Sequence, residues 1–131
     1  MDLHGLHVLL AEDNDLNAEI AVSLLEEQGM IVTRAADGKS ALIQFCNTAP
    51  GTFDLILMDI MMPDMNGYET TKAIRNLPDR PDGKEIPIIA MTANAFAEDV
   101  QAALDAGMDD HVAKPMDMDI LISAIEKCVK R

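Results

Sequence analysis

Polar side chains suited to metal binding and phosphoryl transfer follow four short apolar runs in this chain. They are the acidic pair Glu12 and Asp13, then Asp59, Thr92 and Lys114. In a parallel sheet the carboxyl ends of the strands gather along one edge, where α/β proteins build their sites. Carboxylates, a hydroxyl and an ammonium at that edge suit a divalent cation and a transferred phosphoryl group. Asp59 would be the nucleophile.

The three carboxylates are predicted to form a cation site. In a doubly wound sheet of strand order 2-1-3-4-5 the first and third strands are neighbours, so Glu12 and Asp13 would lie close to Asp59. Two such charges ~4 Å apart repel by about 4 kcal/mol at an effective dielectric of roughly 20. A hard cation relieves this repulsion, and oxygen ligands favour Mg²⁺ or Mn²⁺. The alternative for Asp13, with Asn14 and Asp15, is to cap the following helix.

Thr92 and Lys114 complete the predicted phosphoryl site. Taken singly, Thr92 is typical of a strand end and Lys114 of a solvated surface. Beside the acidic cluster, the threonine hydroxyl can donate to one phosphoryl oxygen and the lysine ammonium can neutralise another. Pro115, directly after Lys114, fixes the backbone there and allows a cis bond.

The composition sets the class of protein and excludes several partners. The chain has 131 residues, of which 49% are hydrophobic, so one globular domain spanning 1–131 is expected. The formal net charge of −13 disfavours direct binding to nucleic acid and to an anionic membrane surface, because both need clustered Lys and Arg. Cys46 and Cys128 lie in helix-like apolar patterns outside any CxxC motif and are predicted to be buried, reduced thiols.

Targeting segments are not expected from the sequence. The apolar runs are far too short to span a bilayer, and the first residues lack a signal-peptide pattern. The chain is therefore predicted to be cytoplasmic, or a cytoplasmic piece of a larger protein.

Apolar runs of strand length alternate with helical patterns five times. Strands are predicted at 6–11, 31–35, 53–58, 87–91 and 111–113. Leu16, Ile20 and Leu24 recur at helical spacing and form the predicted stripe of the first helix, which Ala21 and Leu25 widen. The other helices are predicted around 41–45, at 68–77, around 96–104 and from 117 to 128. The polar segment 78–85, rich in Pro and Gly, is predicted to be a mobile loop without a catalytic role.

This order predicts an α/β fold with a doubly wound parallel sheet. Each connection between strands is long enough to contain a helix, so the strands should be parallel and the crossovers right-handed. One open sheet with helices on both faces follows.

The chain resembles the receiver (response-regulator) domain of two-component signalling, over about residues 6–129. The matching stretches are VLLAEDN at 8–14, LMDIMMPDMNG at 57–67, IAMTA at 89–93 and AKP at 113–115. The resemblance implies a flavodoxin-like (βα)5 fold with strand order 2-1-3-4-5. It also implies that Asp59 is the phosphoacceptor.

Further site residues are implied by the same resemblance. Mg²⁺ would be held by Glu12, Asp13, Asp59 and the backbone carbonyl of Met61. Thr92 would be the switch hydroxyl, and Lys114 the ammonium that clamps the phosphoryl group. The donor would be a phosphohistidine on a histidine kinase or a histidine phosphotransfer protein. The isolated domain would promote its own phosphorylation and dephosphorylation without being an enzyme, and could form a homodimer when phosphorylated.

Two positions depart from the family pattern. Glu12 stands where the family often has Asp, and its longer arm still reaches a cation, directly or through water. His111 stands where the family usually has Tyr or Phe. Its imidazole could rotate with the switch threonine and respond to pH near neutrality, or it could be a partly exposed edge-strand residue.

The motifs at 6–14 and 91–95 look most like receivers fused to the C-terminus of hybrid histidine kinases, whose parent chain can be membrane-anchored. A stand-alone response regulator is the alternative. An aspartyl-phosphate phosphohydrolase is less well supported, because its Asp-x-Asp motif would need an acid where Met61 stands. A docking-only pseudo-receiver would be expected to lose Asp59 or Lys114, and both are present.

Overall fold

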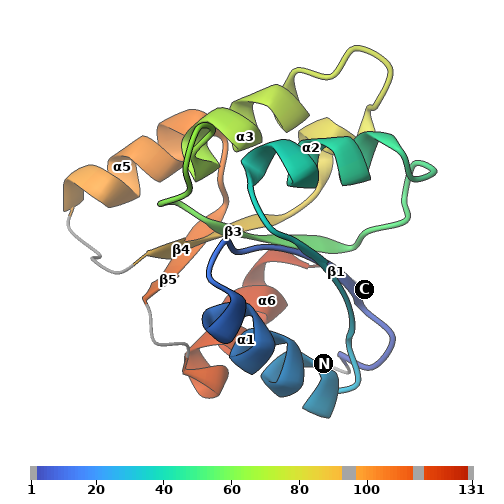
Figure 1. The fold of residues 1–131 in the computed structure, drawn as a ribbon, viewed down its shortest axis with the longest axis vertical. Helices are drawn as coiled ribbons and strands as arrows, with labels where there is room; N and C mark the ends of the chain where they lie inside the picture. Colours follow the sequence, from blue (N-terminus) through green and yellow to red (C-terminus); the bar gives the residue numbers. More distant parts are fainter. Residues whose placement is uncertain (1–2, 93–96, 114–116, 130–131) are drawn as a thin grey trace.

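The computed structural model describes residues 3–92, 97–113 and 117–129. Its centre is a five-stranded parallel sheet of order β2-β1-β3-β4-β5 (Figure 1). The strands are β1 (His7–Ala11), β2 (Ile31–Ala35), β3 (Leu55–Asp59), β4 (Ile88–Thr92) and β5 (Asp110–Ala113). The predicted strand order, parallel pairing and flavodoxin-like architecture are thereby confirmed.

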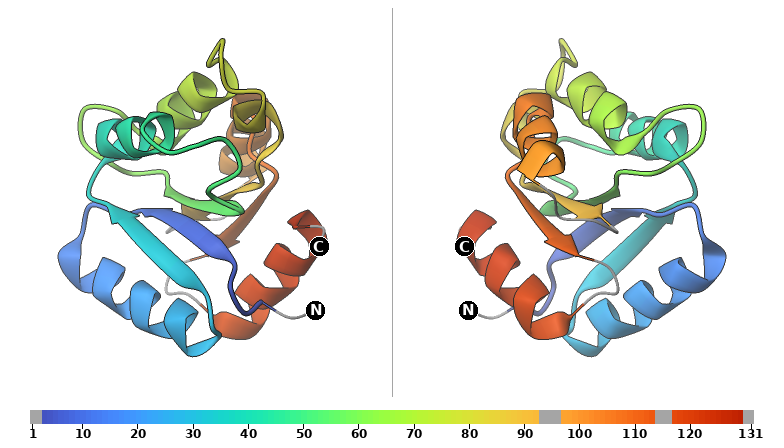
Figure 2. Two further views of the ribbon diagram at one scale, coloured as in Figure 1. Left: turned by 90° about the vertical axis from the view of Figure 1, so that its right-hand side faces the viewer. Right: turned by 90° about the vertical axis from the view of Figure 1, so that its left-hand side faces the viewer.

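Helices cover both faces of the sheet. They are α1 (Asp15–Glu27), α2 (Gly38–Cys46), α3 (Gly67–Arg75), α4 (Asp82–Glu85), α5 (Ala97–Ala106) and α6 (Met118–Cys128). Figures 1 and 2 show α1 and α6 on one face and α2, α3 and α5 on the other. The central strands are therefore buried on both sides, which explains why they are continuous apolar runs.

Two apolar cores follow from the alternation of side chains along the strands. In β3, Leu55 and Leu57 pack into the core beneath α1 and α6, whereas Ile56 and Met58 pack into the core beneath α2 and α3. All four of these side chains are fully buried. This double burial leaves the carboxyl edge of the sheet as the place where polar groups of the strands reach solvent.

The predicted stripe of α1 is confirmed for Ala21 and Leu25, which are buried, and wrong for Leu16 and Ile20. Leu16 and Ile20 are 64% and 50% exposed, and the buried face consists of Ala18, Ala21 and Leu25. The two sets of residues occupy neighbouring faces of one helix, so apolar spacing alone does not separate them. The two small alanines let α1 approach the sheet closely, and this close packing turns the larger side chains outward.

The segment 78–85 is also more ordered than its composition predicted, because it contains the short helix α4. Arg80 donates from Nη1 to the carbonyl oxygen of Phe45 at 2.6 Å, and its guanidinium carbon lies 4.4 Å from the centre of the Phe45 ring. The same guanidinium pairs with Asp82 at 2.8 Å and holds the pKa of that carboxyl below its usual value. Arg80 thus ties the connection between α3 and β4 to the end of α2.

Arg75 fixes the connections that lead into β4 and β5. Its guanidinium donates to the carbonyl oxygens of Gly83, Ile86 and Gly107 at 3.1, 2.7 and 2.9 Å. It also pairs with Asp109 at 3.0 Å. One side chain at the end of α3 therefore satisfies three backbone carbonyl groups from two separate connections, α3–β4 and α5–β5.

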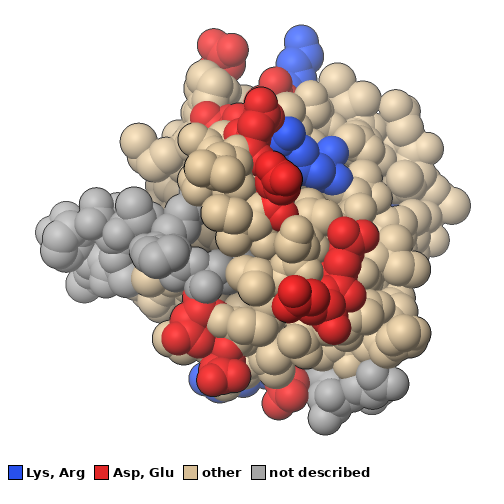
Figure 3. All heavy atoms as spheres, turned by 60° about the horizontal axis from the view of Figure 1, so that its bottom comes forward, with Lys and Arg blue, Asp and Glu red and all other residues tan. Residues whose placement is uncertain are grey.

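The surface is strongly acidic. Figure 3, which turns the bottom of Figure 1 forward, shows Asp and Glu side chains predominating over Lys and Arg on that face. None of the helices in the described part of the chain is long and apolar enough to cross a bilayer.

The prediction that both thiols are buried is wrong for Cys46, which is exposed. Cys128 is half-buried, and its burial raises the pKa of its thiol.

We expect Arg80→Ala to lower the free energy of unfolding by about 2 kcal/mol, because it removes a charged hydrogen bond to the Phe45 carbonyl and a cation–π contact. Urea denaturation monitored by circular dichroism measures this change. Asp79→Ala, at an exposed position of the same connection, is the control and should change stability by less than about 0.5 kcal/mol. Equal effects of the two substitutions would contradict the role given to Arg80.

Candidate functional site

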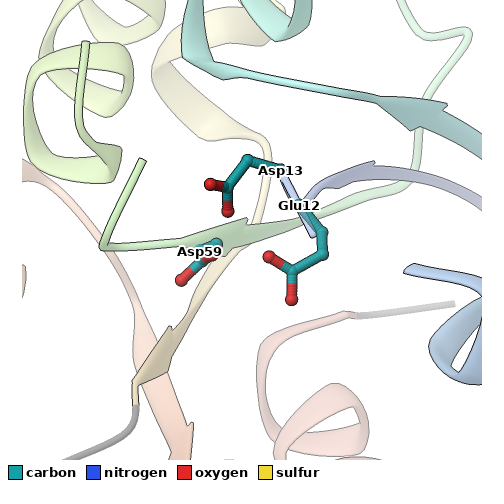
Figure 4. A group of neighbouring side chains, drawn as sticks. All are labelled: Glu12, Asp13 and Asp59. Atoms are coloured by element: carbon teal, nitrogen blue, oxygen red, sulfur yellow. The ribbon is translucent and has the colours of Figure 1, made fainter. Parts of the chain in front are cut away.

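Three carboxylates meet at the carboxyl edge of the sheet. In the parallel pairing of β1 with β3, Ala11 lies opposite Met58, so the residues that follow them, Glu12 and Asp59, leave the sheet side by side. One oxygen from each of Glu12, Asp13 and Asp59 lies within 4.8 Å of the others. Figure 4 shows the three side chains converging on one point from the ends of the two strands.

The burial of the three carboxylates differs. Glu12 and Asp59 are only 2% and 3% exposed, whereas Asp13 is open to solvent. Concentrating negative charge on buried groups is costly unless a cation compensates it. A set of oxygen ligands reached from solvent on one side fits a hard divalent cation such as Mg²⁺ or Mn²⁺. The residues present therefore match the predicted metal site in type and in proximity.

The backbone of Glu12 is held by the neighbouring strand β2. Its N–H donates to the carbonyl oxygen of Ala35 at 3.1 Å. Its own carbonyl oxygen accepts two hydrogen bonds from Arg34, at 3.1 Å from Nε and 2.8 Å from Nη2. Arg34 also pairs with Asp15 at 2.9 Å. Arg34 had not been predicted as a site residue, because its position in β2 becomes informative only when the strand register is known.

The loop after Asp59 folds back over the end of β3. The N–H of Met61 donates to Oδ1 of Asp59 at 3.3 Å, and the N–H of Gly67 donates to the carbonyl oxygen of Ile60 at 3.0 Å. A Cβ on Gly67 would collide with the carbonyl oxygen of Asp59. Asn66 then starts α3 through a capping box with Glu69. The Asn66-Gly67 pair was predicted only as loop punctuation, but Gly67 is needed for this close approach.

Thr92 lies on the same edge of the sheet. It is the last residue of β4, it is 8% exposed, and it stands one residue beyond Met91, which pairs with Asp59. The fold therefore brings Thr92 to the strand adjacent to the proposed acceptor. Lys114 and Pro115, predicted to complete the phosphoryl site, lie outside the described residues.

The structure also describes two other residues that the sequence singled out, His111 and Met61. His111 lies in β5, half-buried, with Nδ1 3.8 Å from Oδ1 of Asp110. It precedes by two residues Ala113, the strand partner of Thr92. The side chain of Met61 points to solvent and is 76% exposed, so it offers an apolar surface and no acidic group beside Asp59.

An open parallel sheet of order β2-β1-β3-β4-β5 with helices on both faces is that of the doubly wound α/β proteins, which bind ligands at the topological switch point. Here the acidic groups at the ends of β1 and β3 lie at that point. The chain belongs to the response regulator receiver domain family, which it matches over residues 8–126.

Known relatives place this chain among receivers of sensor kinases. The aerobic respiration control sensor protein ArcB of Escherichia coli K12 is 42% identical over 127 residues, covering 97% of this chain. The chain spans only 16% of ArcB's own length.

The similar solved structures include receiver domains of a sensor histidine kinase and of a response regulator. The receiver domain of the sensor histidine kinase PA1611 from Pseudomonas aeruginosa PAO1, which has a magnesium ion coordinated in its active site cleft, is similar with a TM-score of 0.83 and 36% identity. That match covers 95% of this chain and 97% of the other. The Ssk1 receiver domain of Saccharomyces cerevisiae, solved with the histidine phosphotransfer protein Ypd1, gives a TM-score of 0.82 at 27% identity, over 97% of this chain and 90% of the other.

We expect Asp13→Asn to raise the thermal midpoint in EDTA, because it removes one of three clustered like charges; the gain in stability at low salt is up to about 1 kcal/mol. The same substitution should reduce the additional stabilisation that Mg²⁺ gives to the wild type, because a metal ligand is lost. Thermal denaturation with EDTA or with MgCl₂ measures both effects. Glu19→Gln removes an exposed charge on α1 outside the cluster and should leave the response to Mg²⁺ unchanged. A wild type that gains no stability from Mg²⁺ would contradict the metal site.

Proposed function

We propose that this chain is a phosphoacceptor receiver domain whose Asp59 accepts a phosphoryl group from a phosphohistidine on a histidine kinase or a histidine phosphotransfer protein. The observation that carries the proposal is the convergence of the buried Asp59 with Glu12 and Asp13 at the carboxyl edge of the sheet. Membership of the receiver family supports the same chemistry.

In the proposed reaction, a carboxylate oxygen of Asp59 attacks phosphorus in line with the bond to the donor imidazole. The new bond is an acyl phosphate, and the P–N bond breaks with its electron pair leaving on the imidazole. Water later hydrolyses the acyl phosphate. Lys114 offsets charge on one phosphoryl oxygen, and the hydroxyl of Thr92 donates to another.

Mg²⁺ is the cofactor proposed for this site, with Mn²⁺ as a substitute. Its ligands would be Glu12, Asp13, Asp59 and the backbone carbonyl of Met61. When bound, the ion neutralises charge that develops on the transferred phosphoryl group. Both the convergence of the three carboxylates and the magnesium-bound relative support this assignment.

The output of the domain is proposed to be a change in a partner-binding surface. Movement of Thr92 toward the phosphoryl group would repack the end of β4 and bias a two-state equilibrium near β5 and α6. His111, in place of the usual aromatic residue, would move with it. Phosphorylation could also favour a homodimer through this change.

The proposed context is a hybrid histidine kinase, with residues 6–129 forming the core of one receiver domain spanning 1–131. The similarity to ArcB supports this context. In it the domain is cytoplasmic, is not an enzyme by itself, and contacts neither nucleic acid nor lipid. A stand-alone response regulator is the alternative for the same domain.

The donor protein is proposed to dock on apolar side chains that flank the acidic site. Leu16 lies in the first turn of α1, three residues after Asp13, and Met61 lies two residues after Asp59. Together with Ile20, these side chains are 50% to 76% exposed. Large exposed apolar groups beside a functional site are typical of a protein interface. The relative solved with Ypd1 supports a histidine phosphotransfer protein as the occupant.

We expect the wild type, incubated with MgCl₂ and acetyl phosphate, to gain one phosphoryl group in intact mass. Asp59→Asn should gain none, because its amide is not a nucleophile for phosphorus. Omitting Mg²⁺ should slow the gain in the wild type.

Labelling of Asp59→Asn to the same extent as the wild type would place the acceptor elsewhere. Labelling of neither protein, together with absence of Mg²⁺ binding, would favour a docking-only pseudo-receiver. Turnover of a phosphomonoester would instead indicate a phosphohydrolase.

We expect Leu16→Ser and Ile20→Ser together to slow phosphoryl transfer from a phosphorylated histidine phosphotransfer protein by about tenfold or more, because each removes interface area worth about 1 kcal/mol. The rate with acetyl phosphate should stay unchanged, since that donor needs no docking. Ile43→Ser, at a 47% exposed position of α2 on the other face, is the matched control. An equal loss with acetyl phosphate would show damage to the site rather than to docking.

A further inference from the structure

A groove with a volume of about 330 Å³ lies between β5 and α6. One wall consists of Asp110 and His111 from β5. The other wall is formed by Asp119, Ser123 and Lys127 of α6, which follow one another at four-residue spacing and so share one face of the helix. The volume lies at the lower end of the range for ligand pockets, which is enough for one long side chain.

Apolar and charged side chains both line this groove. Ile120 is 58% exposed and Ala124 is buried, and both line the groove. Two carboxylates, Asp110 and Asp119, line it together with one ammonium, Lys127, and the imidazole of His111, whose Nδ1 lies 3.8 Å from Oδ1 of Asp110. Among the residues that the structure describes, neither Asp119 nor Lys127 has an ion-pair partner. The groove therefore offers apolar contact together with an excess of negative charge.

A partner strand is a poor fit for this place. Although β5 is an edge strand, paired only with β4, the backbone N–H of His111 already donates to Oδ1 of Asp110 at 2.8 Å. That N–H is thus occupied by the neighbouring side chain, so one of the backbone donors that an added strand would use is already taken. The groove is better suited to a side chain that enters it than to a backbone that extends the sheet.

We propose that the groove between β5 and α6 binds a basic side chain, arginine or lysine, presented by a partner protein. The aliphatic stem of such a side chain packs against Ile120 and Ala124, as long basic side chains do on apolar surface. Its cationic head pairs with Asp119 and Asp110. Lys127 repels the bound cationic side chain, so removing the charge of Lys127 should strengthen binding.

N-acetyl-arginine amide serves as the probe, with N-acetyl-citrulline amide as its uncharged isostere. Titration of the unphosphorylated, ¹⁵N-labelled protein is followed by the amide resonances of β5 and α6. We expect saturable shifts at the groove, with a dissociation constant about threefold or more weaker for citrulline, the size of effect that one exposed ion pair supports. This experiment needs no phosphoryl transfer, so its outcome is independent of the function proposed above.

Three variants test whether the arginine probe binds in the groove. Asp119→Asn should weaken arginine binding by about three- to fivefold, and Lys127→Gln should strengthen it by about two- to fivefold. Glu126→Gln removes one exposed charge from the same helix outside the groove and should have no effect.

Several results would overturn the proposal. Equal binding of citrulline and arginine would remove the role of charge. Equal weakening by Asp119→Asn and Glu126→Gln, or shifts centred on Asp59 instead of the groove, would indicate general attraction to an acidic protein. Sedimentation showing a dimer that Asp119→Asn dissociates would assign the groove to a second copy of this chain.

Discussion

Two nearly buried carboxylates, Glu12 and Asp59, lie beside each other at the carboxyl edge of the sheet, and the surrounding structure holds them there. Left to themselves, like charges at this separation would move apart or take up a proton. The parallel pairing of β1 with β3 prevents the first response, since it fixes the backbone from which both side chains depart. A divalent cation bound between these carboxylates would relieve the repulsion between them.

The elements around this pair hold the backbone from which the two carboxylates depart. Arg34 reaches across from β2 to the carbonyl oxygen of Glu12, and Gly67 lets the start of α3 press against the carbonyl of Asp59. Arg75 gathers the loop carbonyls that lead into β4 and β5. Side chains that bind a ligand are held more precisely in position when their backbone is fixed by other groups.

The outer surface has two separate regions of different chemical character. Beside the acidic site, α1 turns Leu16 and Ile20 outward, which gives an apolar surface where the proposed protein donor would dock. On the far side of β4, the groove between β5 and α6 combines apolar and charged side chains. The two surfaces are joined through the sheet, because Asp59 pairs with Met91 and Thr92 pairs with Ala113.

The sequence by itself determined the alternation of strands and helices, the doubly wound sheet and the candidate residues Glu12, Asp13, Asp59 and Thr92, because strand-length apolar runs and the polar residues that end them are local patterns. Only the tertiary structure decided which face of α1 is buried, how Arg34 and Gly67 support the site, and how Arg80 orders the segment before β4. Those outcomes depend on strand register, on the closeness of helix packing and on contacts between residues far apart in the chain. Local spacing does not record such contacts, since the same apolar stripe fits two faces of a helix until a sheet is placed against one of them.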